Sequence, residues 1–238
     1  MIHTRSIEDD GRFLFMVTRS GTVKRLPVEQ LKNIRQNGIR ALTLDEGDEL
    51  INVMRTDGEQ NILMATHNGQ AICFAETDVR AMGREAVGVR GIRPREGDYV
   101  VALAIVDPQK TLLVASENGL GKRTSFDEYR TQGRGGTGIK TMNCTDKTGK
   151  VVSATVVSEE DELMLMTTAG QSVRIKVATV RETGRATQGV KLMTLNDGEA
   201  IQDISIVIPD DEDEEGAEGA EDAEAGEDSG EAEAPAEE

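Results

Sequence analysis

The sequence contains no tryptophan, and aromatic residues make up 3% of its 238 positions. So few rings argue against the aromatic platforms on which single-stranded nucleic acids stack their bases. The two cysteines, Cys73 and Cys144, form no CxxC pair, and the chain has no secretory signal and no run of 18 apolar residues. These absences predict a reduced, cytosolic protein that uses no disulfide and has no membrane partner.

Motifs for catalysis and cofactor binding are also missing. The two histidines, His3 and His67, have no second ligand or nucleophile at motif spacing, so neither a metal centre nor a catalytic triad is expected. Residues 133–138 (GRGGTG) fit G-x-G-x-x-G, but no strand and helix flank them. Residues 119–124 (GLGKRT) lack the first glycine and the final Ser or Thr of a phosphate-binding loop. We therefore expect no catalytic residue, no cofactor and no metal.

The negative charge is concentrated at one end of the chain. The formal net charge is −17, yet residues 209–238 hold 16 Asp and Glu and no Lys or Arg. Without that segment, 28 acidic residues nearly balance 27 basic ones. Residues 209–238 also lack aromatic and branched aliphatic side chains, so we predict a disordered acidic tail. A solubilising and a regulatory role for this tail are equally open.

Residues 1–208 contain four copies of one unit. Each copy has an apolar run ending in Thr or Ser, a turn with glycine, a second run and then a cation, in segments 13–32, 62–80, 112–130 and 163–181. The turn glycines are Gly21, Gly69, Gly119 and Gly170. A second glycine recurs with spacings of 50, 50 and 51 residues, at Gly38, Gly88, Gly138 and Gly189.

The units have β chemistry, because short apolar runs flank glycine turns and helical spacing does not persist. About four strands fit into each unit of roughly 50 residues, the dimensions of a propeller blade. We predict an all-β, propeller-like array of four four-stranded blades over residues 12–58, 60–108, 110–158 and 161–208. Residues 1–10 look like the last strand of a preceding blade, so the array is either a closed ring or an open arc cut from a longer one.

Positive charge recurs at fixed places in the repeat. The first cation column lies eleven residues after the turn glycine and contains Lys32, Arg80, Arg130 and Arg181. The second cation column lies two residues after the second glycine and contains Arg40, Arg90, Lys140 and Lys191. One explanation is that each cation pairs with an acid of the neighbouring blade, although no acidic column recurs as cleanly.

The alternative explanation is a band of cations along one rim. Equivalent positions on equivalent blades lie on one side of the array, and spaced Lys and Arg suit the phosphates of a duplex. Further candidate contacts are Arg84, Arg93, Lys122, Arg123, Arg134 and Arg185. Because no recognition helix is expected, the pattern predicts sequence-tolerant binding of double-stranded DNA that bends along the rim. A propeller that docks an acidic protein remains the rival hypothesis.

Three stretches resemble a known family: VRAMG…GVRGIR…EGD (79–98), ENGLGKRT (117–124) and RATQGV (185–190). Set in 50-residue repeats before an acidic tail, they are similar to the C-terminal domain of DNA gyrase A. The resemblance implies a β-pinwheel with strands swapped between blades, whose rim wraps DNA. It also implies a non-catalytic module that supports ATP-dependent negative supercoiling by a holoenzyme of gyrase A and gyrase B, at the nucleoid in the bacterial cytoplasm. The corresponding C-terminal domain of topoisomerase IV is the alternative within this group.

The hallmark of the family is a Q-R-R-G-G-K-G box in its first blade. The nearest stretch here is a degenerate box made of Gln132, Gly133, Arg134, Gly135, Gly136, Thr137 and Gly138. It has Gly133 in place of the arginine at the second position and Thr137 in place of the lysine. Family domains have about six blades, so the resemblance implies that the chain holds the last four, with the full box upstream of Met1.

Overall fold

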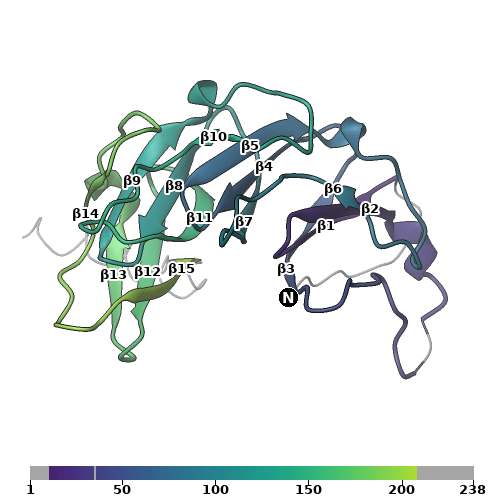
Figure 1. The fold of residues 1–238 in the computed structure, drawn as a ribbon, viewed down its shortest axis with the longest axis horizontal. Helices are drawn as coiled ribbons and strands as arrows, with labels where there is room; N and C mark the ends of the chain where they lie inside the picture. Colours follow the sequence, from purple (N-terminus) through teal and green to yellow (C-terminus); the bar gives the residue numbers. More distant parts are fainter. Residues whose placement is uncertain (1–10, 35, 208–238) are drawn as a thin grey trace, which may run out of the picture. The chain divides into compact units, whose positions relative to one another are not determined.

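The computed structural model describes residues 11–34 and 36–207. The strand predicted within residues 1–10 and the disordered tail predicted for residues 209–238 lie outside this range. The described elements are fifteen β-strands and four short 3₁₀ helices, which together give the predicted all-β fold (Figure 1). No helix in these ranges has the length and apolar character needed to span a bilayer.

The first sheet has the strand order β3-β1-β2-β6. Its strands are β1 (Phe13–Thr18), β2 (Thr22–Pro27), β3 (Leu50–Thr56) and β6 (Val89–Arg90), and η1 (Val28–Leu31) follows β2. The first three strands come from one repeat, whereas β6 belongs to the next. The outer edge of the sheet, opposite β3, is therefore supplied by the following repeat.

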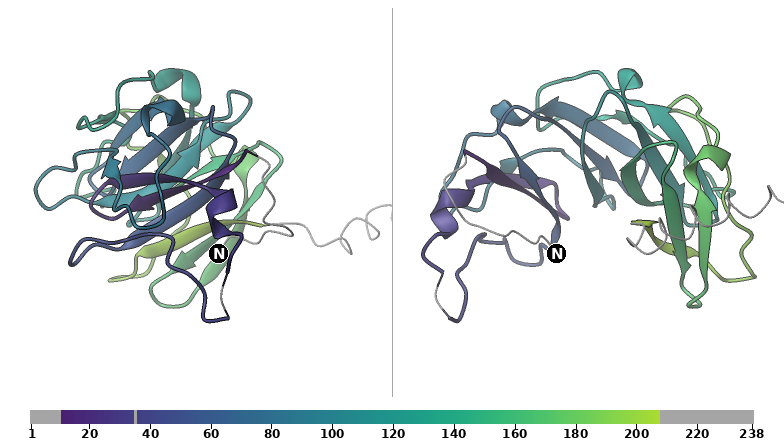
Figure 2. Two further views of the ribbon diagram at one scale, coloured as in Figure 1. Left: turned by 90° about the vertical axis from the view of Figure 1, so that its right-hand side faces the viewer. Right: turned by 180° about the vertical axis from the view of Figure 1, so that it is seen from behind.

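The second and third sheets are built in the same way. The second, ordered β10-β5-β4-β7, contains β4 (Asn61–Thr66), β5 (Gln70–Ala75), β7 (Val100–Ile105) and β10 (Ile139–Lys140), with η2 (Glu76–Asp78) after β5. The third, ordered β11-β8-β9-β14, contains β8 (Thr111–Ser116), β9 (Leu120–Ser125), β11 (Val151–Val157) and β14 (Val190–Lys191), with η3 (Phe126–Glu128) after β9. Figure 2 shows the same strands from two further sides, coloured along the sequence.

The fourth sheet differs from the prediction of four strands. Its order is β13-β12-β15, from β12 (Glu162–Thr167), β13 (Ser172–Lys176) and β15 (Ile201–Val207), with η4 (Val177–Thr179) after β13. The other sheets take their fourth strand from the next repeat, and the described residues contain no donor for β13. The exchange also explains why Ile39 and Arg40, the counterparts of β6 in the first repeat, lie outside any strand here.

The donated strands keep one register throughout. Arg90 pairs with Thr22, Lys140 with Gln70 and Lys191 with Leu120, each partner being the residue after a turn glycine. The strand swap implied by the resemblance is thus present at three successive junctions.

Three hydrophobic clusters fill the spaces between neighbouring sheets. Along β4, Ile62 and Met64 pack toward the first sheet, while Leu63 and Ala65 pack toward the third. All four side chains are fully buried. Successive side chains of a strand point to opposite faces, so a strand covered on both faces must be apolar at every position. This burial on two faces explains the continuous apolar run of residues 62–65.

The turn glycines close the hairpins as the sequence predicts. Gly21 has φ +92° and donates its N–H to the Thr18 carbonyl at 3.0 Å, and Gly69 does the same to Thr66 with φ +80°. Glycine is favoured because other residues rarely adopt positive φ without strain. The second glycines meet a further constraint: a Cβ on Gly138 would lie 2.4 Å from the Ala71 carbonyl oxygen.

This close approach predicts different costs for two alanine substitutions. Gly138 and Gly97 have φ values of +75° and +72°, but nothing lies within 4 Å of the Cβ position of Gly97. Gly97→Ala should cost about 1 kcal/mol from backbone strain alone, and Gly138→Ala about 3 kcal/mol, since the swapped strand must also shift. Chemical denaturation of the two variants measures the difference. Equal costs would contradict the close contact as a constraint on the junction.

Candidate nucleic-acid interface

The second cation column lies on the swapped strands. Arg90, Lys140 and Lys191 are the last residues of β6, β10 and β14, and all three side chains are exposed. Each backbone completes the preceding sheet, while the side chain remains in solvent. Arg40 is exposed as well, although it lies in no strand.

The first cation column is attached to the same outer strands. Arg80, Arg130 and Arg181 are exposed, and each follows a buried residue at the end of a 3₁₀ helix. The residue after each cation forms a parallel bridge to the outer strand of the preceding sheet, in the pairs Arg25–Ala81, Cys73–Thr131 and Arg123–Glu182. Lys32 of the first repeat is exposed too.

We call the segments between the two columns the crossing loops; they comprise residues 81–89, 131–139 and 182–190. Each crossing loop starts at a parallel bridge to the outer strand and ends as the swapped strand on that same outer strand. One cation of each column therefore flanks every crossing loop. This local geometry is equivalent at all three junctions.

The first explanation left open above was that each column cation pairs with an acid, and no such pair occurs within residues 11–34 and 36–207. Ion pairs among the described residues include Arg19–Glu49, Arg123–Glu159 and Arg174–Glu162, and the His67 ring lies near the Glu117 carboxylate. None of these involves a residue of the two columns. Instead, Lys140 and Lys191 each reach a side-chain oxygen three residues ahead, on Asn143 and Thr194.

Arginines inside the crossing loops bind backbone oxygens of the second column. Arg84 donates to the carbonyl of Arg40 at 3.5 Å, Arg134 to that of Arg90 at 3.0 Å and Arg185 to that of Lys140 at 2.8 Å. Each bond joins one repeat to the repeat before it, so these guanidinium groups fix the spacing of successive column cations. Planar guanidinium presents several donors in a fixed geometry, which lysine cannot reproduce.

Lys122 and Arg123 require a correction, because both were predicted to contact DNA. Lys122 is fully buried, and Arg123 is 8% exposed. The Arg123 Nε donates to the Val180 carbonyl at 2.7 Å, and its guanidinium lies 3.7 Å from the Glu159 carboxylate. Their β9 strand is covered by the crossing loop of the next repeat, so neither side chain is available to a phosphate.

Lys24 in β2 corresponds to Lys122 in β9, and it is 1% exposed. Burial lowers the pKa of both lysines below the ordinary value, to about 8 for Lys122. Nearby Glu85 opposes this shift at Lys24, and Glu128 opposes it at Lys122. At neutral pH the ammonium group of Lys122 thus remains mostly charged, although it is out of contact with water.

The degenerate box forms most of the second crossing loop. Gln132 donates its N–H to the Cys73 carbonyl, and Gly135 donates its N–H to the carbonyl of Gly91, the residue after β6. Gly136 accepts from the N–H of Arg93, whose side chain is exposed. Gly133, Thr137 and Arg134 are exposed. The box is therefore tied by backbone bonds to the previous repeat and presents Arg134 at its surface.

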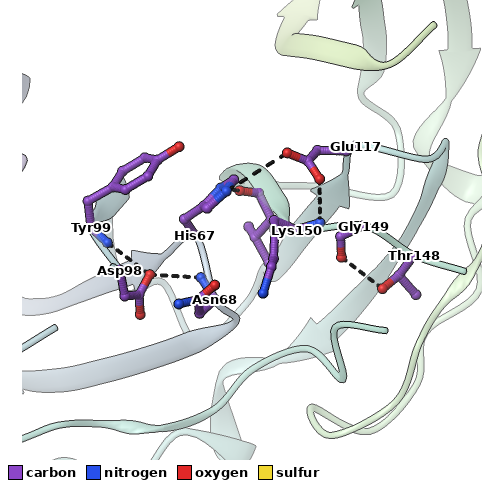
Figure 3. Close-up of polar contacts among 9 residues, drawn as sticks. His67, Asn68, Asp98, Tyr99, Glu117, Thr148, Gly149 and Lys150 are labelled. Carbon is purple, nitrogen blue, oxygen red and sulfur yellow. Dashed lines mark hydrogen bonds and ion pairs between the residues drawn. The ribbon is translucent and has the colours of Figure 1, made fainter. Parts of the chain in front are cut away.

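A ladder of side chains that the sequence analysis missed joins the first three sheets at their hairpin turns. The His67 ring stacks on Tyr99 at 4.6 Å between centroids, and the Arg19 guanidinium lies 3.6 Å from the centre of the Tyr99 ring. Glu117 of the third sheet lies 3.8 Å from the Nε2 of His67 (Figure 3). Arg19, His67 and Glu117 share one column of the repeat, but their chemistry differs, so recurrence could not reveal them.

The hairpin turns are also held by carboxylates, in two opposite ways. Asp98 accepts the N–H of Asn68 at 2.8 Å, so an acid outside the turn binds the turn (Figure 3). In the third sheet Glu117, within the turn, accepts the N–H of Lys150 at 2.8 Å. Both sheets therefore have a carboxylate that bonds to a backbone N–H between the hairpin turn and the segment beside it. The carboxylate belongs to that segment in the second sheet and to the turn in the third, where Lys150 takes the position of Asp98.

Comparison with known proteins identifies the family. The model of the family described as "DNA gyrase C-terminal domain, beta-propeller" matches residues 12–57, 60–107, 110–158 and 161–208. The chain belongs to the DNA gyrase C-terminal domain family. It corresponds to a domain of gyrase A rather than to the whole protein.

The curated relatives are whole gyrase A proteins. The chain is 56% identical to the DNA gyrase A of Streptococcus pyogenes serotype M1 over 211 residues, which are 89% of this chain and 26% of that protein. It is 55% identical to the DNA gyrase A of Halalkalibacterium halodurans over 204 residues, 85% of this chain and 24% of that protein. The chain thus spans about a quarter of the length of the curated relatives it matches.

Two solved structures share the fold. A DNA gyrase A C-terminal domain matches with a TM-score of 0.77 and 28% identity, covering 86% of this chain and 68% of that one. The C-terminal domain of a DNA topoisomerase IV matches with a TM-score of 0.83 and 25% identity, covering 94% of this chain and 70% of that one. The fold alone therefore does not separate the gyrase domain from its topoisomerase IV counterpart.

The backbone bonds of the loop arginines lead to a test on this gyrase-family domain. Arg134→Lys keeps the charge but loses the bonds from the guanidinium to the carbonyls of Asp78 and Arg90. We expect a loss of about 1 kcal/mol in the free energy of unfolding, since the bonds are charge-assisted but exposed. Urea denaturation measures it, with Arg130→Lys, at an exposed cation of the same repeat, as the control. Equal stabilities of the two variants would contradict a bridging role for Arg134.

Proposed function

We propose that the chain is the duplex-DNA-binding and DNA-wrapping module of DNA gyrase A, which supports ATP-dependent negative supercoiling by the holoenzyme. Its partners are double-stranded DNA, the remainder of gyrase A and the gyrase B protein, at the nucleoid of the bacterial cytoplasm. Identity of 56% to a whole gyrase A protein favours this assignment over the topoisomerase IV counterpart.

The observation that carries the proposal is the pair of exposed cations beside every crossing loop. Arg80 with Arg90, Arg130 with Lys140 and Arg181 with Lys191 are exposed and belong to no ion pair among the described residues. Because a phosphate must displace no internal carboxylate to reach them, they suit a polyanion. Repetition along successive sheets suits a ligand that carries regularly spaced phosphates.

The elements beside these cations favour backbone contacts over base reading. The helices η2, η3 and η4 each have three residues, too few to lie along a major groove. Lys and Arg on short strands and glycine loops contact phosphates without distinguishing bases. Binding should thus tolerate many sequences and draw its specificity from how easily the DNA bends.

The salt dependence of duplex affinity distinguishes a phosphate-binding surface from an apolar interface. If about six phosphates are neutralised, the affinity for a random-sequence duplex should fall about a thousandfold between roughly 50 and 200 mM salt. Lys140→Gln should weaken binding equally for all sequences and reduce the salt slope by about 0.9. Lys110→Gln is the control, since Lys110 is exposed in the turn between β7 and β8 and belongs to neither cation column nor any crossing loop.

A flat salt response, or equal effects of the two substitutions, would count against a phosphate interface. Tight binding of an acidic protein together with weak duplex binding would instead favour the docking propeller. Both ligands are anionic, so the comparison is made at matched salt concentration.

The acidic tail predicted for residues 209–238 should restrain DNA binding. If the segment is disordered as predicted, its sixteen carboxylates would compete with phosphates at a local concentration near millimolar. Since each exposed ion pair contributes only about 0–1 kcal/mol, a chain ending at Ile208 should bind duplex DNA several-fold tighter at low salt. The difference should close as salt screens both competitors. Paired titrations measure this, and equal affinities at low salt would leave the tail as a solubility device.

A further inference from the structure

One position of the repeat lies directly under each crossing loop. It is the third residue after the turn glycine, on the outer strand of the sheet: Lys24 in β2, Ile72 in β5 and Lys122 in β9. All three side chains are buried, with at most 1% exposed. The first and third sheets thus use a lysine where the second sheet uses an aliphatic residue.

The two lysines bind the same part of the loop in different repeats. The Nζ of Lys24 donates to the carbonyls of Arg84 at 2.6 Å, Ala86 at 2.8 Å and Ala41 at 2.9 Å. All three donors of this ammonium are therefore used. The Nζ of Lys122 donates to the carbonyls of Gly184, at 2.6 Å, and Arg185.

Arg185 is consequently fixed at three points. Its carbonyl accepts from Lys122, its N–H donates to the Glu128 carboxylate at 2.8 Å and its guanidinium donates to the Lys140 carbonyl at 2.8 Å. The cation of Lys122 thus binds the carbonyl of Arg185, and the anion of Glu128 binds its N–H. The Arg185 side chain connects the same residue to Lys140 of the second cation column. The loop's path is thus set by charge-assisted bonds rather than by its own sequence.

Packing alone does not require a lysine at this position. Ile72 fills it in the second sheet, with its Cδ1 at 3.7 Å from the Cβ position of Gly136 in the degenerate box. A buried ammonium costs desolvation free energy that an aliphatic side chain avoids. In return, carbonyls bound to a buried cation resist displacement more than carbonyls that face an apolar side chain.

We propose that Lys24 and Lys122 are positioning residues that hold the crossing loops 81–89 and 182–190 in the conformation that presents their flanking cations to DNA. The inference rests on the proposed function. Neither lysine touches the phosphates; each acts through the loop carbonyls. The second crossing loop, above Ile72, has no lysine beneath it and is held by backbone bonds, packing and the exposed Arg134 guanidinium, so it is the most adaptable of the three.

Lys122→Ile tests the proposal, because it installs the side chain that the second sheet already accommodates. Amide hydrogen exchange in residues 182–190 should accelerate about tenfold or more, while exchange in β8 and β11 stays unchanged. Affinity for a random-sequence duplex should fall about threefold to tenfold as the loop loses its ordered state. Lys24→Ile should give the same result for residues 81–89, so a folding defect in one variant leaves the other decisive.

Lys191→Gln is the matched control, since it removes an exposed cation from the end of the same loop. It should reduce the salt slope of binding by about 0.9 without changing loop exchange. Unchanged exchange in the lysine-to-isoleucine variants would overturn the proposal, whatever their affinity. A reduced slope without faster exchange would mean direct phosphate contact, which also overturns it.

The outcomes separate this inference from the proposed function. If the unmodified chain binds no duplex, the proposed function fails and the positioning role in DNA binding fails with it. Faster loop exchange in that case would still assign the lysines as loop anchors for another ligand. If the unmodified chain binds and Lys122→Ile binds equally well with a loosened loop, the positioning role alone is refuted.

Discussion

The outer strand of each of the first three sheets leaves a row of backbone N–H and C=O groups that the next repeat satisfies. Such an edge is open to pairing with other chains when it is left uncovered. The donated strands have only two residues each, so their ladder bonds alone hold them weakly. Further bonds next to them, such as those from Gly91 and Ile92 to the Gly21 carbonyl, and the burial of Ile92 stabilise the junction. The same contacts therefore complete each sheet and attach the next repeat to it.

This arrangement joins structure and charge in the same residues. The backbone of Arg90 completes the first sheet, its carbonyl accepts from Arg134, and its side chain lies in solvent. The position of the charge along the chain of sheets is therefore set by strand pairing rather than by the flexibility of a loop. A cation on a swapped strand cannot shift by one residue without exchanging the inward and outward faces of that strand.

The sequence predicts much of the fold because the repeat shows the same pattern four times. Turn glycines, apolar runs and cation columns all have local causes, so periodicity reveals them. The pattern does not show which sheet the fourth strand joins. Val89 follows a glycine, just as a strand that pairs in a hairpin within its own repeat would. The pattern of the repeat therefore does not assign it to the previous sheet. The resemblance implied a swap between blades, and the three-dimensional path shows which strand is exchanged.

The charge of a side chain alone does not predict a DNA contact, because a buried cation cannot reach a phosphate. Lys122 and Arg123 resemble a basic pair on a turn, yet the next repeat covers them. The covering segment, around Arg185, lies 63 residues after Lys122 in the sequence. Likewise, the stacking of His67 on Tyr99 depends on two turns of one sheet meeting, which spacing does not encode. Contacts between residues distant in sequence are the part that pattern reasoning leaves out.

The direction of the strand exchange also fixes an order of events on the ribosome. The third strand of the first sheet ends at Thr56, but its fourth strand begins only at Val89. Synthesis proceeds from the N-terminus, so each sheet must wait with an open edge while most of the following repeat is made. A translation error or a stall within one repeat consequently damages the sheet that was made before it.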